Sequence, residues 1–207
     1  MPTTAARTRS HTGFSPREAA FATGLSEKTI NQAIDRAEVG VPGHARSGAE
    51  RLLGFPDLLY LRLRGDVGRL LSAEGKRRLR QQLAHAVRGR QSPTAVSIGV
   101  VEVQVESEAR ALEEKLARIE EARTFVVSDP EVRAGEPVVR GTRIPVHALA
   151  DLASQGADHD ELLEDYPALT RESLEAALLY ARMYPRRGRP RRAPWKERPE
   201  ARSGGTR

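Results

Sequence analysis

The chain has 207 residues, no Cys, and 34 Lys and Arg against 28 Asp and Glu, giving a formal net charge of +6. This length suits one or two small domains rather than a large single-core enzyme. The absence of Cys excludes a disulfide framework, thiolate zinc sites and cysteine nucleophiles. The first 13 residues are polar, and no later apolar run approaches the roughly 18 residues that a membrane span requires. We therefore expect a cytoplasmic protein with no membrane contact.

Charge is distributed along the chain in three blocks. Residues 1–100 carry 16 basic and 8 acidic residues, residues 101–184 carry 9 and 18, and residues 185–207 carry 9 and 2. The net charges are therefore +8, −9 and +7. Basic blocks at both ends favour anionic partners there, although solvated surface charge that happens to be grouped would give the same pattern.

The N-terminal part of the sequence predicts a disordered segment followed by a sharply defined helix. Residues 1–13 are polar and lack periodicity, so they are expected to be disordered. Ser15 then suits an N-cap, Pro16 suits the first helical position, and Glu18 completes a capping box. The helix is expected to extend to about Ala22.

The residues that follow fit a helix-turn-helix. Such a unit needs a small residue where the helices cross, Gly at the turn, and apolar residues that anchor the second helix. Ala20, Gly24 and Ile30 meet these requirements, together with Ala33 and Ile34. An ordinary pair of helices with a Gly corner is the alternative interpretation.

The outward face of the second helix suits a DNA major groove. Asn and Gln side chains can pair with adenine, and Lys can reach guanine or phosphate. We therefore predict contact with operator double-stranded DNA through a set of polar and basic residues on both helices. They are Arg17, Ser26 (the predicted cap), Lys28, Thr29, Asn31, Gln32 and Arg36.

A Gly-rich stretch at 39–51 is predicted to form a loop or wing, followed by helices at 56–63 and 72–87. Ser15-Pro16-Arg17-Glu18-Ala19-Ala20 opens the first helix, and Phe55-Pro56-Asp57-Leu58 opens a later one. With these motifs, residues 14–90 resemble the winged helix-turn-helix domain of the MerR family. The resemblance implies DNA binding, but no effector-binding residues of that family map onto this chain.

The middle of the chain, residues 91–123, is interpreted as a strand-helix connector that dimerises. Residues 95–105 are rich in Val and Ile and are predicted to form one strand. Residues 107–123 are predicted to form a helix whose apolar stripe spans about two heptads, a length that suits packing on a second subunit. The contacts expected in a homodimer or higher oligomer are Leu112, Leu116, Ile119, Val139 and Ile144.

Residues 124–184 are predicted to form a β-hairpin plus three-helix domain. A short strand is expected at 124–127, and a hairpin at 137–146 with its turn near Arg140-Gly141. The three helices are expected at 146–155, at 158–165 with an Asp158 and Glu161 capping box, and at 170–183. The fold class predicted for the whole chain is α+β, mainly α.

Short motifs mark this C-terminal half. They are Gly135-Glu136-Pro137-Val138-Val139, Arg140-Gly141-Thr142-Arg143-Ile144-Pro145-Val146, Tyr166-Pro167-Ala168-Leu169-Thr170 and Ala176-Ala177-Leu178. Together they resemble the domain-of-unknown-function family 433, found in VapB-type antitoxins, over residues 124–184. Turn and helix-start chemistry accounts for most of the motif, so Thr142 and Arg143 are assigned no catalytic role. The resemblance implies an antitoxin that binds a PIN-domain ribonuclease toxin.

The basic tail, residues 185–207, is predicted to be disordered when alone. Its Arg187-Gly188-Arg189-Pro190 resembles an AT-hook core, whose arginines lie in a narrow A·T minor groove. The antitoxin resemblance implies instead that the tail binds the acidic centre of the toxin, and a solubilising tail without a partner is a third possibility. The toxin-binding residues expected are Arg186, Arg187, Arg189, Arg191, Arg192 and Trp195.

No pattern in the sequence indicates catalysis. The five His are scattered without metal-ligand spacing, and there is no phosphate-binding loop or nucleophile elbow. We therefore expect no enzymatic activity, no metal and no cofactor. We interpret the chain as the antitoxin of a type II toxin–antitoxin system that neutralises a PIN-domain ribonuclease toxin and autoregulates its operon by binding DNA. The alternatives are a stand-alone MerR-like transcription regulator and an interaction scaffold that binds no DNA.

Overall fold

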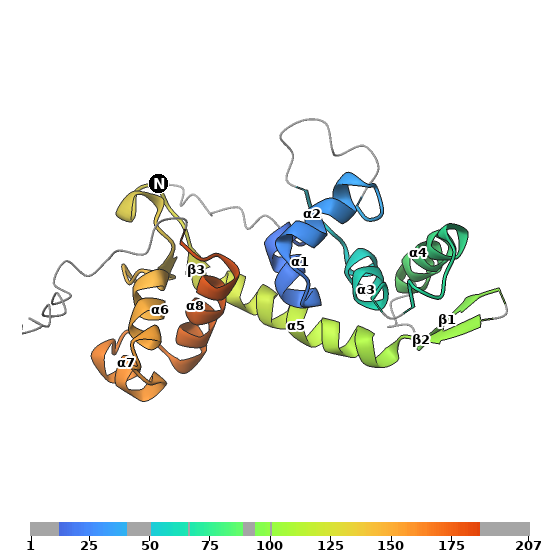
Figure 1. The fold of residues 1–207 in the computed structure, drawn as a ribbon. Helices are drawn as coiled ribbons and strands as arrows, with labels where there is room; N and C mark the ends of the chain where they lie inside the picture. Colours follow the sequence, from blue (N-terminus) through green and yellow to red (C-terminus); the bar gives the residue numbers. More distant parts are fainter. Residues whose placement is uncertain (1–12, 41–50, 66, 89–93, 100, 187–207) are drawn as a thin grey trace, which may run out of the picture.

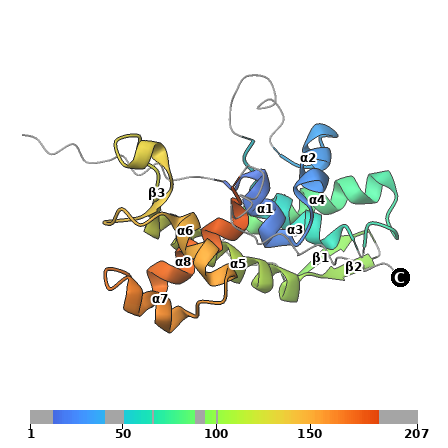
Figure 2. The same cartoon turned by 60° about the vertical axis from the view of Figure 1, so that its left-hand side comes forward.

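Helix α5 (Glu106–Phe125) joins two groups of helices in the computed structural model, which describes residues 13–40, 51–65, 67–88, 94–99 and 101–186. Helices α1 to α4 lie along one side of α5, a β-hairpin lies at its N-terminal end, and helices α6 to α8 lie at its C-terminal end (Figures 1 and 2). The described chain is α+β and mainly helical, with eight α-helices and two small sheets, which confirms the predicted fold class at that level.

The bounds of the other helices are α1 (Pro16–Thr23), α2 (Glu27–Asp35), α3 (Phe55–Leu63), α4 (Ala73–Arg88), α6 (Val146–Ser154), α7 (His159–Asp165) and α8 (Arg171–Met183), with a short 3₁₀ turn η2 (Arg133–Gly135). Helix starts follow the local chemistry: Ser15 and Glu18 form a capping box on α1, as Asp158 and Glu161 do on α7. Most of the predicted wing, residues 41–50, lies outside the described residues, as do residues 1–12 and 187–207.

The single strand predicted at 95–105 is wrong, because the structure forms two strands there. β1 (Ala95–Ile98) pairs antiparallel with β2 (Val101–Gln104), so that Val96 lies opposite Val103. Gly99 has φ +65° between them, a conformation that Gly adopts without a Cβ penalty. The hydrophobic run continues through the turn, which is why its Val and Ile content indicated one strand.

The second sheet also differs from the prediction. β3 (Val126–Val127) pairs antiparallel with β4 (Val138–Val139), so the principal partner of β4 precedes it in the chain. The expected hairpin at 137–146 is reduced to a single bridge between Val138 and Pro145, around a turn in which Gly141 has φ +78°. The physical reason is that Pro145 has no N–H to donate to a ladder and is followed at once by α6.

Helix α8 contributes to two hydrophobic cores. One core packs α1 to α5 together, and the other lies among β4, α6, α7 and α8. One side of α8 faces the first core with Ala176, Leu179 and Met183, and the other side faces the second core with Leu174, Ala177 and Ala181. The two groups of helices therefore share one structural element.

The apolar stripe of α5 lies inside the chain rather than on a free surface. Leu112 and Ile119 are fully buried and Leu116 is 6% exposed, in the core that α5 shares with α1, α3 and α8. Val139 is also buried, in the second core, and Ile144 packs against that core. These five residues thus pack within the chain, and their assignment as dimer contacts stays a prediction. Side chains that their own chain covers have little apolar area left to bury against a second copy.

Candidate nucleic-acid interface

Helices α1 and α2 form a tight unit joined by Gly24. Gly24 has φ +75°, donates its backbone N–H to the Ala20 carbonyl and ends α1. Ser26 then caps α2 by accepting the backbone N–H of Thr29 at 3.1 Å. These local features set the direction in which α2 leaves α1.

The inner faces of the two helices pack on each other and on the first core. Ala19, Ala22 and Ile30 are fully buried and Ala33 is 1% exposed. Ala20, the residue expected at the helix crossing, is only partly buried. Among the described elements, α2 packs mainly on α1 and extends away from α5 (Figure 1), and these elements leave its outer face largely uncovered.

Three of the predicted DNA-binding residues present unengaged side chains on α2. Lys28 and Gln32 are exposed and Asn31 is half-buried. Among the described residues, none of the three side chains makes a hydrogen bond or an ion pair. Their donors and acceptors are therefore available to base edges or phosphates.

The other four predicted residues have partners within the chain. Arg17 pairs with Glu27 at 3.4 Å and its guanidinium lies 5.7 Å from the centre of the Tyr184 ring. The hydroxyls of Ser26 and Thr29 hydrogen-bond each other at 2.8 Å, and Arg36 lies 4.0 Å from a Glu38 carboxylate oxygen. Among the described residues, the structure thus separates Lys28, Asn31 and Gln32, whose side chains have no partner, from four residues whose side chains already have one.

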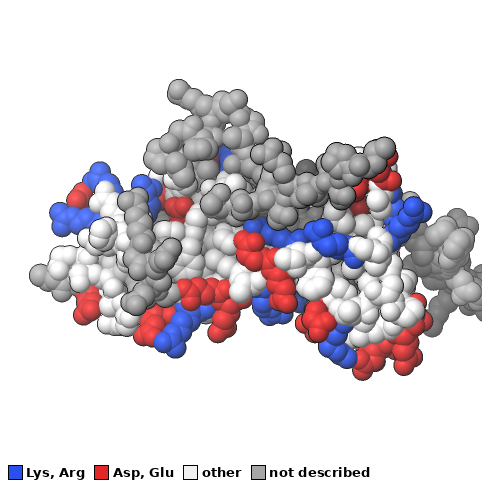
Figure 3. All heavy atoms as spheres, turned by 180° about the vertical axis from the view of Figure 1, so that it is seen from behind, with Lys and Arg blue, Asp and Glu red and all other residues white. Residues whose placement is uncertain are grey.

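Helix α2 with its C-cap carries no net charge, because Glu27 and Asp35 balance Lys28 and Arg36. Positive charge, which attracts phosphate, is therefore supplied in this region by neighbouring elements rather than by α2. Helix α4 is the strongest candidate, with one acidic residue, Glu74, against five basic ones. Seen from behind, acidic side chains gather mainly along the lower edge of the molecule, where α5 and α7 lie (Figure 3).

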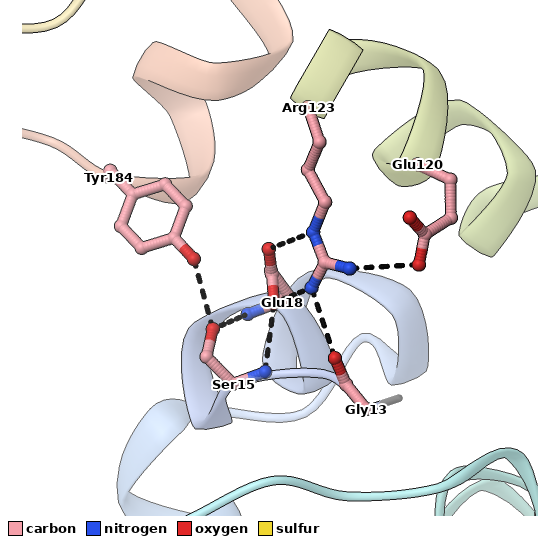
Figure 4. Close-up of polar contacts among 6 residues, drawn as sticks. All are labelled: Gly13, Ser15, Glu18, Glu120, Arg123 and Tyr184. Atoms are coloured by element: carbon pink, nitrogen blue, oxygen red, sulfur yellow. Dashed lines mark hydrogen bonds and ion pairs between the residues drawn. The ribbon is translucent and has the colours of Figure 1, made fainter. Parts of the chain in front are cut away.

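A buried polar cluster connects α1 to α5. Arg123 Nε donates to Glu18 Oε1 at 3.0 Å, and Arg123 Nη2 donates to Glu18 Oε2 at 2.7 Å (Figure 4). The Glu18 side chain is 5% exposed, and Arg123 also donates to the Gly13 carbonyl and to Glu120. Burial by itself would raise the pKa of Glu18, but hydrogen bonds from Arg123 and Ser15 outweigh it and hold that pKa below its ordinary value.

The same cluster connects α1 to the end of α8. The Ser15 hydroxyl that caps α1 lies 3.0 Å from the Tyr184 hydroxyl (Figure 4). The Tyr184 ring stacks on Tyr180 with ring centres 4.8 Å apart. Burial raises the pKa of Tyr184 to about 12, partly offset by the hydrogen bond with Ser15. The cap of the first helix of the candidate DNA-binding unit is thus held by the C-terminal domain.

Only one residue of the predicted toxin-binding set is described. Arg186 pairs with Glu136 at 2.8 Å and with Asp151 at 3.4 Å on the surface of the C-terminal domain. The others, Arg187, Arg189, Arg191, Arg192 and Trp195, lie outside the described residues. Nearby, the pKa of His147 is lowered, first by burial and then by the positive charge of Arg186.

In the described part of the chain, no three His, Asp or Glu side chains are grouped so that they could hold a metal ion. Among the described helices, none has both the length and the apolar character needed to cross a bilayer.

Sequence reasoning missed the ion pair between Glu18 and Arg123 and the contact between Ser15 and Tyr184. Glu18 had a complete local explanation as the N3 residue of a capping box, and this role is confirmed. Its second partner lies 105 positions along the chain, beyond the reach of helix-start patterns. The one sequence signal was a basic residue, Arg123, that closely follows Glu120 and Glu121 near the end of α5.

The elements from β3 to α8 define a small helical domain with a two-stranded sheet. Residues 126–181 match the family described as "Protein of unknown function (DUF433)", so this part of the chain is a DUF433 domain. The chain is 40% identical over 82 residues to "Uncharacterized protein y4eO" of Sinorhizobium fredii. That match covers 40% of this chain and 37% of the relative's length.

Two solved structures are also similar. One is a DUF433 member protein from Anabaena variabilis, 36% identical, covering 37% of this chain and 75% of that chain with a TM-score of 0.29. The other is Rv2018 from Mycobacterium tuberculosis, 17% identical, covering 81% of this chain and 97% of that chain with a TM-score of 0.32.

Proposed function

We propose that this chain is a DNA-binding antitoxin of a type II toxin–antitoxin system, in which α2 reads the major groove of the operator upstream of its own gene. The observation that carries DNA binding is the unengaged trio of Lys28, Asn31 and Gln32 on a helix packed mainly through its opposite face. The antitoxin role is supported by the resemblance of the C-terminal half to VapB-type antitoxins. Neutralisation of a PIN-domain ribonuclease is assigned to the basic tail, residues 185–207.

DNA binding is tested by measuring anisotropy of a labelled duplex from upstream of the gene. The double variant K28A/Q32A is expected to weaken binding about 30-fold or more, since each lost base or phosphate contact costs about 1–3 kcal/mol. The matched control is R110A/Q104A, which removes one cation and one amide from exposed positions on α5 and β2. Equal affinity of the K28A/Q32A variant and the wild type would contradict the proposal.

The antitoxin role has a separate test. Co-expression with the product of the neighbouring gene is expected to yield a complex and to relieve growth arrest, and a chain ending at Arg186 is expected to lose both effects. A chain that binds its upstream DNA but neither binds nor neutralises the neighbouring product would instead support the stand-alone MerR-like transcription regulator. A chain with neither property is the interaction scaffold.

A further inference from the structure

A groove of about 490 Å³ lies beside the C-terminal end of α2, between α3 and α4. We call it the basic groove. Among the described residues that line it, the charged ones are Arg36, Glu38, Arg64, Lys76, Arg77 and Arg80. Five basic side chains against one carboxylate make the groove strongly electropositive, in contrast to the neutral helix α2 next to it.

Tyr60 supplies a hydroxyl with no hydrogen-bond partner among the described residues. The residue is 4% exposed and lines the basic groove. Its hydroxyl makes no hydrogen bond with any described residue. Among the described residues, every fully buried side-chain oxygen or nitrogen has a hydrogen-bond partner, so the Tyr60 hydroxyl is not itself fully buried. The hydroxyl therefore reaches the solvent of the groove, where a buried phenol can donate to an anionic oxygen.

Lys76 and Arg80 complete the arrangement. The Lys76 ammonium makes no ion pair with the described residues, so its charge is uncompensated at short range. Arg80 is fixed in place because its Nη1 donates to the backbone carbonyls of Ala37 and Glu38 at 2.9 and 2.7 Å. Ala37 has φ +54°, a conformation costly for a residue with a Cβ, and these bonds stabilise the turn that carries it.

The remaining cations of the groove are partly neutralised within the chain. Arg64 pairs with Glu38, and Arg77 pairs with Glu74. Both keep further N–H groups that can face a ligand, because a guanidinium has five donors. Several cationic side chains and one hydroxyl that line the same groove fit a phosphate better than a carboxylate, because a phosphate offers more acceptor oxygens spread in three dimensions.

We propose that the basic groove binds a phosphate group through Lys76 and the Tyr60 hydroxyl, with Arg80 positioned beside them. The phosphate has two possible sources with the same chemistry: the backbone of a duplex held by α2, or a free phosphorylated small molecule. The duplex source rests on the proposed function, whereas the small-molecule source does not.

The test is calorimetric titration of the full chain with inorganic pyrophosphate at low ionic strength. K76A is expected to weaken binding about tenfold, because a hydrogen bond to a charged group typically contributes that much, and Y60F about threefold. The matched control is R78A, whose side chain is exposed on the same helix, pairs with Glu74 and does not line the groove. It should change the affinity by less than about twofold.

A second arm uses a 20-base-pair duplex of arbitrary sequence and distinguishes the two sources. A backbone site predicts that K76A weakens duplex binding and lowers its salt slope by about one, whereas a small-anion site predicts loss of pyrophosphate binding alone. Thermal unfolding of Y60F and K76A verifies that both variants fold. The proposal would be overturned if the chain bound neither pyrophosphate nor the duplex, or if R78A and K76A lost affinity equally. K28A/Q32A should bind pyrophosphate normally, so failure of the groove and failure of operator recognition are separable.

Discussion

Glu18 and Arg123 lie 105 positions apart in the sequence and form a two-point ion pair in the structure, with N···O distances of 3.0 and 2.7 Å. Glu18 also accepts the backbone N–H of Ser15 at 2.8 Å, so one carboxylate both completes the cap of α1 and fixes α1 to α5. The position of the candidate DNA-binding unit therefore depends on a residue of the long helix.

Loss of Arg123 should destabilise the fold. In R123A the carboxylate of Glu18 stays buried without its cation, and removal of one partner of a buried pair typically costs about 3–5 kcal/mol. Because the Arg123 side chain is 21% exposed, we expect the lower end of this range in urea unfolding. The control is E120A, which removes a half-exposed partner of the same arginine and should cost less than about 1 kcal/mol. Similar losses in both variants would show that the pair is not the stabilising contact.

Acid should weaken the fold partly through Glu18. Its folded-state pKa lies below the ordinary value of 4.5, so the stability it contributes is present above pH 4.5 and is lost as pH falls through the folded pKa. The free energy of unfolding should therefore decrease below pH 4.5, and E18Q should reduce the slope. A residual slope remains because the pKa values of Glu74 and Glu136 are also lowered. An unchanged slope in E18Q would contradict this assignment.

High pH should destabilise the fold through ionisation of the Tyr184 hydroxyl. Its pKa is raised from 10.0 to about 12, chiefly by burial, so its contribution to stability is complete below pH 10 and is lost as pH rises towards 12. Y184F removes the contact with Ser15 while keeping the ring that stacks on Tyr180. We expect a loss of about 1 kcal/mol at pH 7 and a flatter stability profile between pH 10 and 12, measured by chemical unfolding at each pH.

Gly24 should resist substitution for a backbone reason alone. A Cβ there would meet no atom within 4 Å, but φ is +75°. G24A is therefore expected to lower the free energy of unfolding by about 1–2 kcal/mol, and G24N by less. Gly54 provides the comparison because its φ is −89° and a Cβ would lie 3.5 Å from Pro56. G54A should be close to neutral, and equal effects at the two positions would exclude the conformational explanation.

Structural features such as helix caps could be predicted from the sequence when the residues that determine them lie within a few positions of one another. The caps at Ser15, Ser26 and Asp158 are confirmed because each needs only a side chain and an N–H two or three residues away. The same reasoning failed at residues 95–105, where a turn at Gly99 interrupts a continuous apolar run.

Partners across the chain could not be predicted in this way. The spacing of Leu112, Leu116 and Ile119 gives an apolar stripe but does not say which surface covers it. The structure covers it with helices of the same chain, α8 among them, whereas a second subunit was expected. For the candidate interface, Lys28, Asn31 and Gln32 were identified by type and spacing. The basic groove was not, because Tyr60 of α3 comes together with Lys76 and Arg80 of α4 only when these two helices pack.

The burial of α8 in two hydrophobic cores has a consequence for transfer of this domain to another chain. Residues 126–181 form the recognisable DUF433 domain, yet Ala176 and Leu179 within it are covered by the core that contains α5. A gene fusion that carried only this segment to a new chain would leave an apolar strip of α8 exposed to water. A chain that carried only this segment would therefore need another surface to cover Ala176 and Leu179, as α5 does here.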